Sequence, residues 1–307
     1  MSTSHPGIRL RIRMDSGTVA APGAFNALVA RAIARAGFDA AYVSGGAASV
    51  AAGVPDVGLL TLEHFCRVIR EVTEGSGLPV MADADTGFGE AEMTRRTVIE
   101  YHRAGAAGLH LEDQVFPKRC GHLDGKSLVP TDHMAEKIAW AVKASRDCAD
   151  GAFIICARTD ARGVEGMDAA IDRARIYVEA GADMIFPEGL KSEAEFGEFA
   201  AAFKGDTTKG TEASRRQGIQ PGPYLLANMT EFGKTPLIPL SCFAELGYDL
   251  VIYPVTMLRV AMGAVIRALE TLKTEGTVEP ILDEMQSRQD LYDLVGYTPG
   301  KPWEFPG

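Results

Sequence analysis

Two aspartates that end an apolar segment form a candidate cation site. Asp83 and Asp85 are two residues apart, so in an extended strand both carboxylates lie on the same face. Glu112 and Asp113 end another apolar segment, and the four carboxylates could converge. Such a cluster repels itself unless a cation neutralises it, and Mg²⁺ binds one or two carboxylates together with waters and substrate oxygens. An isolated Asp-x-Asp more often caps a helix or pairs with an arginine, but beside the Glu-Asp pair these residues favour a metal.

Cys120 is a candidate acid–base group. It lies in the segment Lys118-Arg119-Cys120-Gly121-His122, which shows no apolar periodicity. Nearby cations lower a thiol pKa from ~8.5 toward neutrality, so such a thiol can donate or accept a proton near pH 7. A free cysteine is otherwise a small hydrophobe. This is our interpretation of the four cysteines in predicted helices or strands or at their ends, namely Cys66, Cys148, Cys156 and Cys242.

Polar residues also follow most of the other apolar segments. They are Ser44-Gly45-Gly46, Arg158-Thr159-Asp160, Glu188 and Asn228-Met229-Thr230. One polar end means little, but their coincidence predicts a shared site, because the chemistry of a barrel enzyme lies at the carboxyl ends of its strands. The predicted strands contain no lysine, so a Schiff-base mechanism has no obvious nucleophile. No glycine-rich dinucleotide or phosphate loop follows a strand.

The elements that must position these residues alternate along the chain. Eight short apolar segments without polar alternation predict strands buried on both faces of a parallel sheet. Helical patterns separate them, and eight βα units favour an α/β fold of the (β/α)₈ TIM-barrel type, with an open doubly wound sheet as the alternative. The predicted strands are Thr18–Ala21, Ala41–Ser44, Pro79–Asp83, Gly108–Glu112, Phe153–Arg158, Met184–Pro187, Tyr224–Asn228 and Leu250–Pro254. The predicted helices include Phe25–Ala36, Leu62–Glu74, Glu90–Ala104, Thr131–Ser145, Met167–Ala180 and Glu193–Phe203.

Two segments do not fit this repeat. Residues 205–222 are polar and exceed the usual helix-to-strand connection of about 2–6 residues. We expect an insertion on the barrel face away from the site. Residues 278–296 form a further amphipathic stretch, and we expect a neighbouring subunit to cover its apolar face. The pattern predicts a catalytic barrel at residues 1–275 and a C-terminal helical extension and tail at 276–307.

Composition and charge exclude several classes of protein. The 307 residues are 46% hydrophobic and 23% charged, which is typical of a soluble globular chain. The net charge of −10, with no basic run, argues against binding nucleic acid or an anionic membrane. No apolar stretch of about 18 residues lacks charges, so no transmembrane helix is expected. Five scattered cysteines without a Cys-x-x-Cys pair predict free thiols in a reducing compartment, and hence a cytoplasmic protein.

Motifs spread over nearly the whole chain carry a family resemblance. They are MADADTGFGE, GLHLEDQVFPKRCGH, ARTDA, FPEG and LLANMTEFGKTP. Together they resemble the isocitrate lyase/phosphoenolpyruvate mutase superfamily, and the KRCGH loop resembles its lyase branch. The resemblance implies a (β/α)₈ barrel, dependence on Mg²⁺ with Mn²⁺ as a substitute, and a homotetramer in which C-terminal helices swap between subunits. The implied reaction cleaves a small anionic carboxylate, 2-methylisocitrate, to pyruvate and succinate in propionate catabolism.

The resemblance also implies roles for individual residues. The implied metal site consists of Asp83, Asp85 and, in the outer shell, Glu112. The implied catalytic residues are Cys120 as general acid on a mobile loop, Tyr42, Arg158 and His122. The initial base stays open between Tyr42 and a metal-held water. The implied substrate-binding residues are Ser44, Gly45, Gly46, Asp56, Cys120, Gly121, Arg158, Glu188, Asn228, Met229, Thr230, Arg259 and Arg288.

The choice of substrate leaves alternatives. Arg158, Arg259 and Arg288 could serve three carboxylates, which favours a tricarboxylate over 2,3-dimethylmalate or oxaloacetate. The alternatives within the superfamily are therefore a 2,3-dimethylmalate lyase and an oxaloacetate hydrolase. An alternative of another class is a catalytically inactive barrel kept for ligand binding. The intact aspartate and cysteine motifs argue against it.

Overall fold

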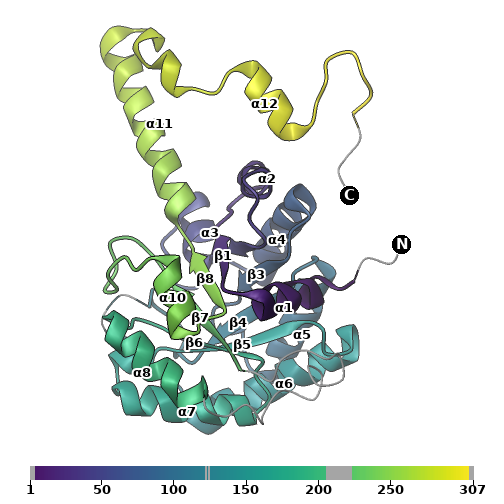
Figure 1. The fold of residues 1–307 in the computed structure, drawn as a ribbon, viewed down its shortest axis with the longest axis vertical. Coiled ribbons are helices and arrows are strands. Elements are labelled where there is room, and N and C mark those ends of the chain that lie inside the picture. Colours follow the sequence, from purple (N-terminus) through teal and green to yellow (C-terminus); the bar gives the residue numbers. More distant parts are fainter. Residues whose placement is uncertain (1–3, 122, 124, 205–222, 304–307) are drawn as a thin grey trace.

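Eight parallel strands form the centre of the fold, with helices around them (Figure 1). The computed structural model describes residues 4–121, 123, 125–204 and 223–303. All eight predicted strands are confirmed to within one residue at each end. They are β1 (Val19–Pro22), β2 (Ala41–Val43), β3 (Val80–Asp83), β4 (Gly108–Glu112), β5 (Ile154–Thr159), β6 (Met184–Pro187), β7 (Tyr224–Asn228) and β8 (Leu250–Tyr253).

The sheet closes on itself, which confirms the predicted barrel. The strand order is β1-β8-β7-β6-β5-β4-β3-β2, and every pairing is parallel. Between β1 and β2 the closure is a parallel bridge of Gly23 with Tyr42, beside which the Ala24 amide donates to the Tyr42 carbonyl at 2.8 Å. All carboxyl ends therefore meet at one end of the barrel, as the candidate site requires.

The helices follow the predicted alternation, with two additions. The helices are α1 (Pro6–Ser16), α2 (Ala27–Arg35), α3 (Gly45–Ala51), α4 (Leu62–Ser76), α5 (Ala91–Arg103), α6 (Thr131–Ala149), α7 (Met167–Glu179), α8 (Glu193–Lys204), α10 (Leu240–Leu246), α11 (Thr256–Glu275) and α12 (Arg288–Val295), with 3₁₀ turns η1 (Ala161–Gly163) and η2 (Glu279–Glu284). The sequence patterns predicted neither α1 nor α3. The predicted insertion at 205–222 lies outside the described residues.

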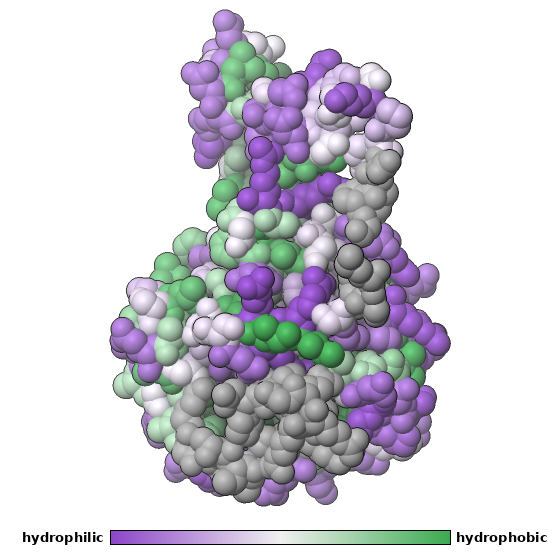
Figure 2. Space-filling view, turned by 45° about the vertical axis from the view of Figure 1, so that its right-hand side comes forward, coloured by the Kyte–Doolittle hydropathy of each residue, from purple (hydrophilic) through white to green (hydrophobic). Residues whose placement is uncertain are grey.

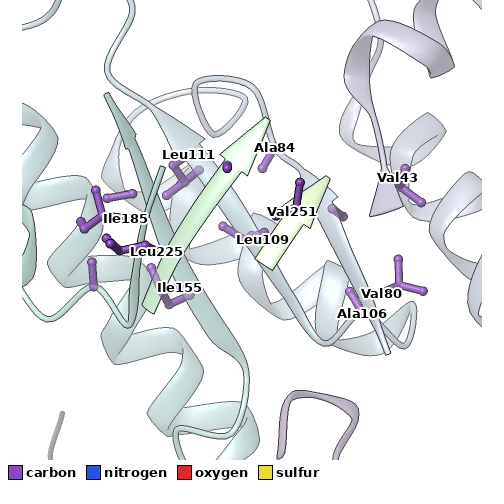
Figure 3. Close-up of a cluster of buried hydrophobic side chains, with 14 of the residues drawn as sticks. Val43, Val80, Ala84, Ala106, Leu109, Leu111, Ile155, Ile185, Leu225 and Val251 are labelled. Atoms are coloured by element: carbon purple, nitrogen blue, oxygen red, sulfur yellow. The ribbon is translucent and has the colours of Figure 1, made fainter. Parts of the chain in front are cut away.

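Two apolar layers hold the barrel together. Side chains such as Leu109, Ile155 and Val251 fill the layer between the sheet and the helices (Figure 3). A second cluster, including Met81 and Phe186, fills the barrel interior. Because successive strand residues alternate between the two layers, the faces of the polar strand-end residues are fixed by their apolar neighbours on the same strand.

Helix α11 leaves the barrel instead of covering β8 (Figure 1). Its apolar residues Val260, Ile266 and Leu269 are 52–68% exposed, and Leu258 is its one buried residue. Figure 2 shows hydrophobic side chains on this projection. Helix α12 returns to α2, where Arg31 donates to the Val295 carbonyl at 3.4 Å. The domain boundary at residue 275 and the swapped helices stay predictions.

The described helices include none that is both long and apolar enough to cross a membrane.

Candidate active site

The paired aspartates Asp83 and Asp85 lie at the carboxyl end of β3, buried and in contact. Asp83 Oδ2 accepts a hydrogen bond from the Gly45 amide at 3.0 Å, and its Oδ1 accepts one from the Asp85 amide at 3.0 Å. A Cβ on Gly45 would lie 2.7 Å from Asp83 Oδ2, so only glycine fits there. Burial and the neighbouring Asp83 charge raise the pKa of Asp85 to about 6. Two carboxylates held this closely favour a cation beside them.

Lys118 is the cation that the structure places against these carboxylates. Its Nζ lies 2.8 Å from Asp85 Oδ1 and also donates to Asp56, while the lysine side chain is 3% exposed. Burial opposes its charge, yet Glu112 and the aspartates around it raise the pKa of Lys118. From the sequence, Lys118 was expected only as a cation that lowers the pKa of the Cys120 thiol two residues later, and not as a partner of the aspartates.

Arg158 occupies the centre of the carboxyl end. Its guanidinium lies 3.2 Å from Glu112, 3.0 Å from Asp160 and 3.5 Å from Glu188. The same guanidinium stacks over the ring of Phe186 at 5.2 Å. These contacts fix the orientation of the planar guanidinium. Its remaining edge therefore points in one direction, where it could bind a carboxylate of a ligand.

Glu112 and Asp113 face opposite ways, as neighbours on a strand must. The Glu112 carboxylate is fully buried beside Arg158, and neither oxygen has a hydrogen-bond partner. Burial raises the pKa of Glu112 well above its usual range. Asp113 instead points behind β5, where it accepts hydrogen bonds from Thr159 at 2.8 Å and Tyr177 at 2.9 Å. The expectation that four carboxylates converge is therefore wrong for Asp113.

The remaining donor set suits a hard cation. In the described part of the chain, no three His, Cys, Asp or Glu side chains gather closely enough to hold a metal by themselves. Mg²⁺ does not require this, because it usually keeps several waters and takes only one or two carboxylates. Asp83 and Asp85 fit that requirement, with the Glu112 carboxylate nearby, whose oxygens accept no hydrogen bond.

Tyr42 and His110 line the barrel interior under this cluster. Tyr42 Oη and His110 Nε2 are 2.7 Å apart, and His110 Nδ1 lies 3.7 Å from Asp83 Oδ1. Burial lowers the pKa of His110 to about 4, so the imidazole is neutral at pH 7. Burial, together with Asp83, raises the pKa of Tyr42 well above its usual value. The Tyr42 hydroxyl therefore lies within hydrogen-bond distance of a neutral imidazole that is itself close to Asp83.

The loop that carries Cys120 lies directly on this cluster. Cys120 is half-buried, and Gly121 is so close that a Cβ on it would be 2.5 Å from Arg158 Nη2 and 2.3 Å from Glu188 Cγ. The Gln114 side chain hydrogen-bonds both the amide and the carbonyl of Arg119 at 2.9 Å. His122 falls outside the described residues.

Other predicted residues border the cluster. Ser44 caps α3 by accepting from the Ala47 amide at 3.2 Å, which places Gly45 and Gly46 in the first turn of that helix. Asn228 Nδ2 donates to Glu188 Oε2 at 3.1 Å, and Thr230 is buried just beyond β7.

Three predicted binding residues are not brought to the cluster in this chain. The Met229 side chain is buried in the apolar core, where its sulfur accepts from the Ile238 amide at 3.2 Å. Arg259 lies on α11, 3.3 Å from Glu231. Arg288 is exposed at the start of α12. Arg259 and Arg288 lie on the segments that leave the barrel, so their roles depend on where those segments lead.

A cavity of about 830 Å³ opens beside the cluster, between α4 and α5. Thr86, Phe88, Gln114 and Phe116 line it, but Asp83, Asp85, Glu112 and Arg158 do not. The candidate site is therefore defined by its converging polar groups and not by the cavity.

Comparison with known proteins gives the family of the chain. Residues 10–273 match the phosphoenolpyruvate phosphomutase family model. A protein of Corynebacterium glutamicum named probable 2-methylisocitrate lyase 1 is 52% identical over 90% of this chain and 84% of its own length. A crystal structure of 2,3-dimethylmalate lyase superposes with a TM-score of 0.82 at 34% identity, covering 96% of this chain and 92% of that one. A phosphonopyruvate hydrolase structure with oxalate and Mg²⁺ has a TM-score of 0.80 at 29% identity, over 96% and 95% of the two chains. From these matches and the shared barrel, the chain belongs to the phosphoenolpyruvate mutase/isocitrate lyase superfamily.

Proposed function

We propose that this chain is a carbon–carbon lyase that cleaves 2-methylisocitrate to pyruvate and succinate. The observation that carries the proposal is the seating of the Cys120–Gly121 segment on Arg158 and Glu188, above the acidic cluster. The proposal is supported by the convergence, at the carboxyl end of the barrel, of the residue after Cys120, the Arg158 guanidinium and several carboxylates. The 52% identity to a protein named as such a lyase supports the same activity here.

We infer that Mg²⁺ is the cofactor, held by Asp83 and Asp85 with Glu112 beside them, and that Mn²⁺ can replace it. The hard carboxylate oxygens of these residues support this assignment, as does the absence of a hydrogen bond to either oxygen of Glu112. A superfamily structure bound to Mg²⁺ supports it as well. When bound, the metal supplies Lewis-acid polarisation of the substrate oxygens, which acidifies a hydroxyl among them.

The protein groups account for the remaining steps. The substrate hydroxyl passes its proton to the initial base, which is Tyr42 or a water molecule. The bond between carbons 2 and 3 then breaks, and its electron pair passes to the succinate fragment as an enediolate. Arg158 and Asn228 stabilise that negative charge. The Cys120 thiol then donates a proton to the carbanion as general acid. The loop against Arg158 excludes bulk water from the enediolate.

The projecting segments support an oligomeric enzyme. The exposed Val260, Ile266 and Leu269 of α11 require cover, and a second copy of the chain in a helix-swapped homotetramer would supply it. The same exchange would carry Arg259 and Arg288 toward a neighbouring site. Light scattering tests the tetramer, and a monomer at micromolar concentration would contradict it. The cytoplasmic location stays a prediction.

A 2,3-dimethylmalate lyase is the second candidate, supported by the 0.82 TM-score to a protein of that name. Within this chain Arg158 is the one arginine of the three placed in the cluster, and a dicarboxylate needs fewer cations than a tricarboxylate. An oxaloacetate hydrolase is a third candidate function for the same cluster of residues. An inactive barrel is disfavoured, because Gly121, the residue directly after Cys120, lies against Arg158 and Glu188.

A substrate panel with Mg²⁺ separates these activities. 2-Methylisocitrate, 2,3-dimethylmalate and oxaloacetate are compared, with pyruvate measured by a coupled assay and the co-product by chromatography. We expect pyruvate with succinate, and a kcat/KM for 2-methylisocitrate about 100-fold or more above the others. Cys120→Ser is the matched inactive control. Absence of pyruvate and succinate from 2-methylisocitrate would contradict the proposal.

A further inference from the structure

Lys126 joins the Cys120 loop to the body of the barrel. Its Nζ lies 2.7 Å from Asp160 Oδ1 and also donates to the Gly121 carbonyl. The lysine side chain is 3% exposed and the Asp160 side chain is fully buried. One ammonium group therefore bonds a loop carbonyl and a residue directly after β5 at the same time.

Asp160 is a rigid anchor for that bridge. Its carboxylate holds Arg158 at two points, 3.0 and 3.2 Å, and its amide donates to Asp113 Oδ1 at 2.9 Å. Tyr177 of α7 fixes Asp113 from behind at 2.9 Å. The network thus runs from α7 through two buried aspartates to Arg158 on one side and Lys126 on the other.

The bridge sets where the loop lies on the site. Gly121 lies so close to Arg158 and Glu188 that a Cβ would clash with them. Because glycine has no side chain, another residue must hold this part of the loop in place. The bond from Lys126 to the Gly121 carbonyl acts at that same residue. Cys120 precedes it directly, and a displacement of ~1 Å in a proton donor can lower turnover about 100-fold.

We propose that Lys126 is a positioning residue, which fixes the Gly121 backbone against Arg158 and thereby sets the distance from the Cys120 thiol to the bound substrate. The inference rests on the proposed lyase activity for its catalytic consequence, but the placement of the loop can be measured without a substrate. Lys126 does not itself carry the proton. A lysine that merely neutralised Asp160 would act through its charge and not through Gly121.

The variants separate these two roles. Lys126→Met removes both the charge and the donor, whereas Lys126→Gln removes the charge and keeps an N–H donor for the Gly121 carbonyl. Lys143→Met is the matched control, because Lys143 forms a lysine–aspartate pair with Asp147 at 2.7 Å on the exposed face of α6. Thermal unfolding of each variant reports whether the fold is retained.

The first readout is alkylation of Cys120 by iodoacetamide, followed by peptide mass spectrometry and taken at its limiting rate at high pH. That limit removes differences in thiol ionisation and reports access alone. We expect a rate about 10-fold higher in Lys126→Met, an intermediate rate in Lys126→Gln, and the wild-type rate in Lys143→Met. An unchanged rate in Lys126→Met, or equal rates in the Met and Gln variants, would overturn the inference.

The second readout is turnover of 2-methylisocitrate. We expect kcat of Lys126→Met to fall about 100-fold with KM within about threefold, and Lys126→Gln to recover part of kcat. A loss confined to KM would contradict a positioning role. If the wild-type chain cleaves no substrate, the proposed function fails, while the alkylation rates still decide the placement of the loop.

Discussion

The two ends of the barrel differ in how their buried charges are balanced. At the amino end, α1 inserts Leu10 and Met14 into the barrel interior. Its Arg11 is buried with Asp183 at 2.9 Å and also donates to the Ala152 carbonyl at 2.5 Å. This buried arginine therefore has an opposite charge beside it, and the pair closes the barrel at this end.

The carboxyl end carries an excess of negative charge. The described ion pairs and electrostatic contacts there join three lysine and arginine side chains to a larger group of carboxylates, namely Asp56, Asp83, Asp85, Glu112, Asp160 and Glu188. Both oxygens of Glu112 lack a hydrogen bond. Buried carboxylates without enough opposite charge lower the stability of the protein. This loss is explained if the function requires a bound cation and an anionic substrate at this end.

Loss of the thiol should produce the largest effect, at the carboxyl end alone. Cys120→Ser should lower kcat for 2-methylisocitrate about 10³-fold, because the carbanion loses its proton donor. Steady-state kinetics measure the loss, and thermal unfolding should be unchanged. Turnover within a few-fold of wild type would refute the general-acid role.

Loss of Arg11 should break the amino end without touching the chemistry. Arg11→Met leaves Asp183 buried without its partner, so the free energy of unfolding should fall by about 3–5 kcal/mol. Urea unfolding measures the change. The kcat of the folded fraction should stay at the wild-type value, and a large fall in kcat would mean that the two ends are not independent.

Replacing a carboxylate by an amide should change the free energy of unfolding in opposite directions at the two ends of the barrel. Glu112→Gln replaces a buried carboxylate with an uncharged group, and Arg158 keeps Asp160 and Glu188 as partners. The metal-free protein should therefore gain about 1 kcal/mol of stability while losing turnover. Asp183→Asn is the matched variant, and it should lose stability because Arg11 remains buried. Changes of the same sign would contradict the comparison.

The smallest predicted effect is a loss of stability at the amino end of the barrel when the pH is lowered. His5 stacks on His102 with ring centroids 5.2 Å apart and a nitrogen–nitrogen distance of 3.1 Å. Burial, then His102, Arg11 and Arg9, lower the pKa of His5 from 6.5 to about 4. Its stabilising contribution is therefore complete above pH 6.5 and is lost as the pH falls toward 4.

The melting temperature at pH 7 and pH 5 tests this contribution. We expect a decrease of a few degrees in the wild type on acidification, and a smaller decrease in His5→Gln. Equal decreases in both proteins would show that His5 does not cause the loss of stability in acid.

The sequence predicted the barrel well because strands buried on both faces are continuous apolar segments. Helix α1 escaped prediction because Arg9, Arg11 and Arg13 interrupt its apolar pattern. The arginine Arg11 is buried only because Asp183, on a distant part of the chain, lies opposite it. Such a pairing exists only after folding.

The sequence indicated which strand ends contribute residues to the site. It did not indicate which of those side chains contact one another. Glu112 and Asp113 are adjacent carboxylates, and only the register of β4 decides which one faces the interior. Lys118 and Lys126 occur in a polar loop, where the pattern gives no reason to choose them over other lysines. Their roles follow from distances to Asp85 and Asp160. Arg259 and Arg288 lie on segments whose path away from the barrel no periodicity indicates.

Binding of Mg²⁺ to the metal-free protein tests the central claim most directly, because it requires no substrate. Thermal unfolding is followed with and without MgCl₂ at constant ionic strength, in the wild type and in Asp85→Asn. We predict that Mg²⁺ at ~100 times its Kd stabilises the wild type by about 2.7 kcal/mol. The variant should gain little or nothing. No stabilisation of the wild type by Mg²⁺ or Mn²⁺, or an equal gain in both proteins, would contradict a cation site at the carboxyl end.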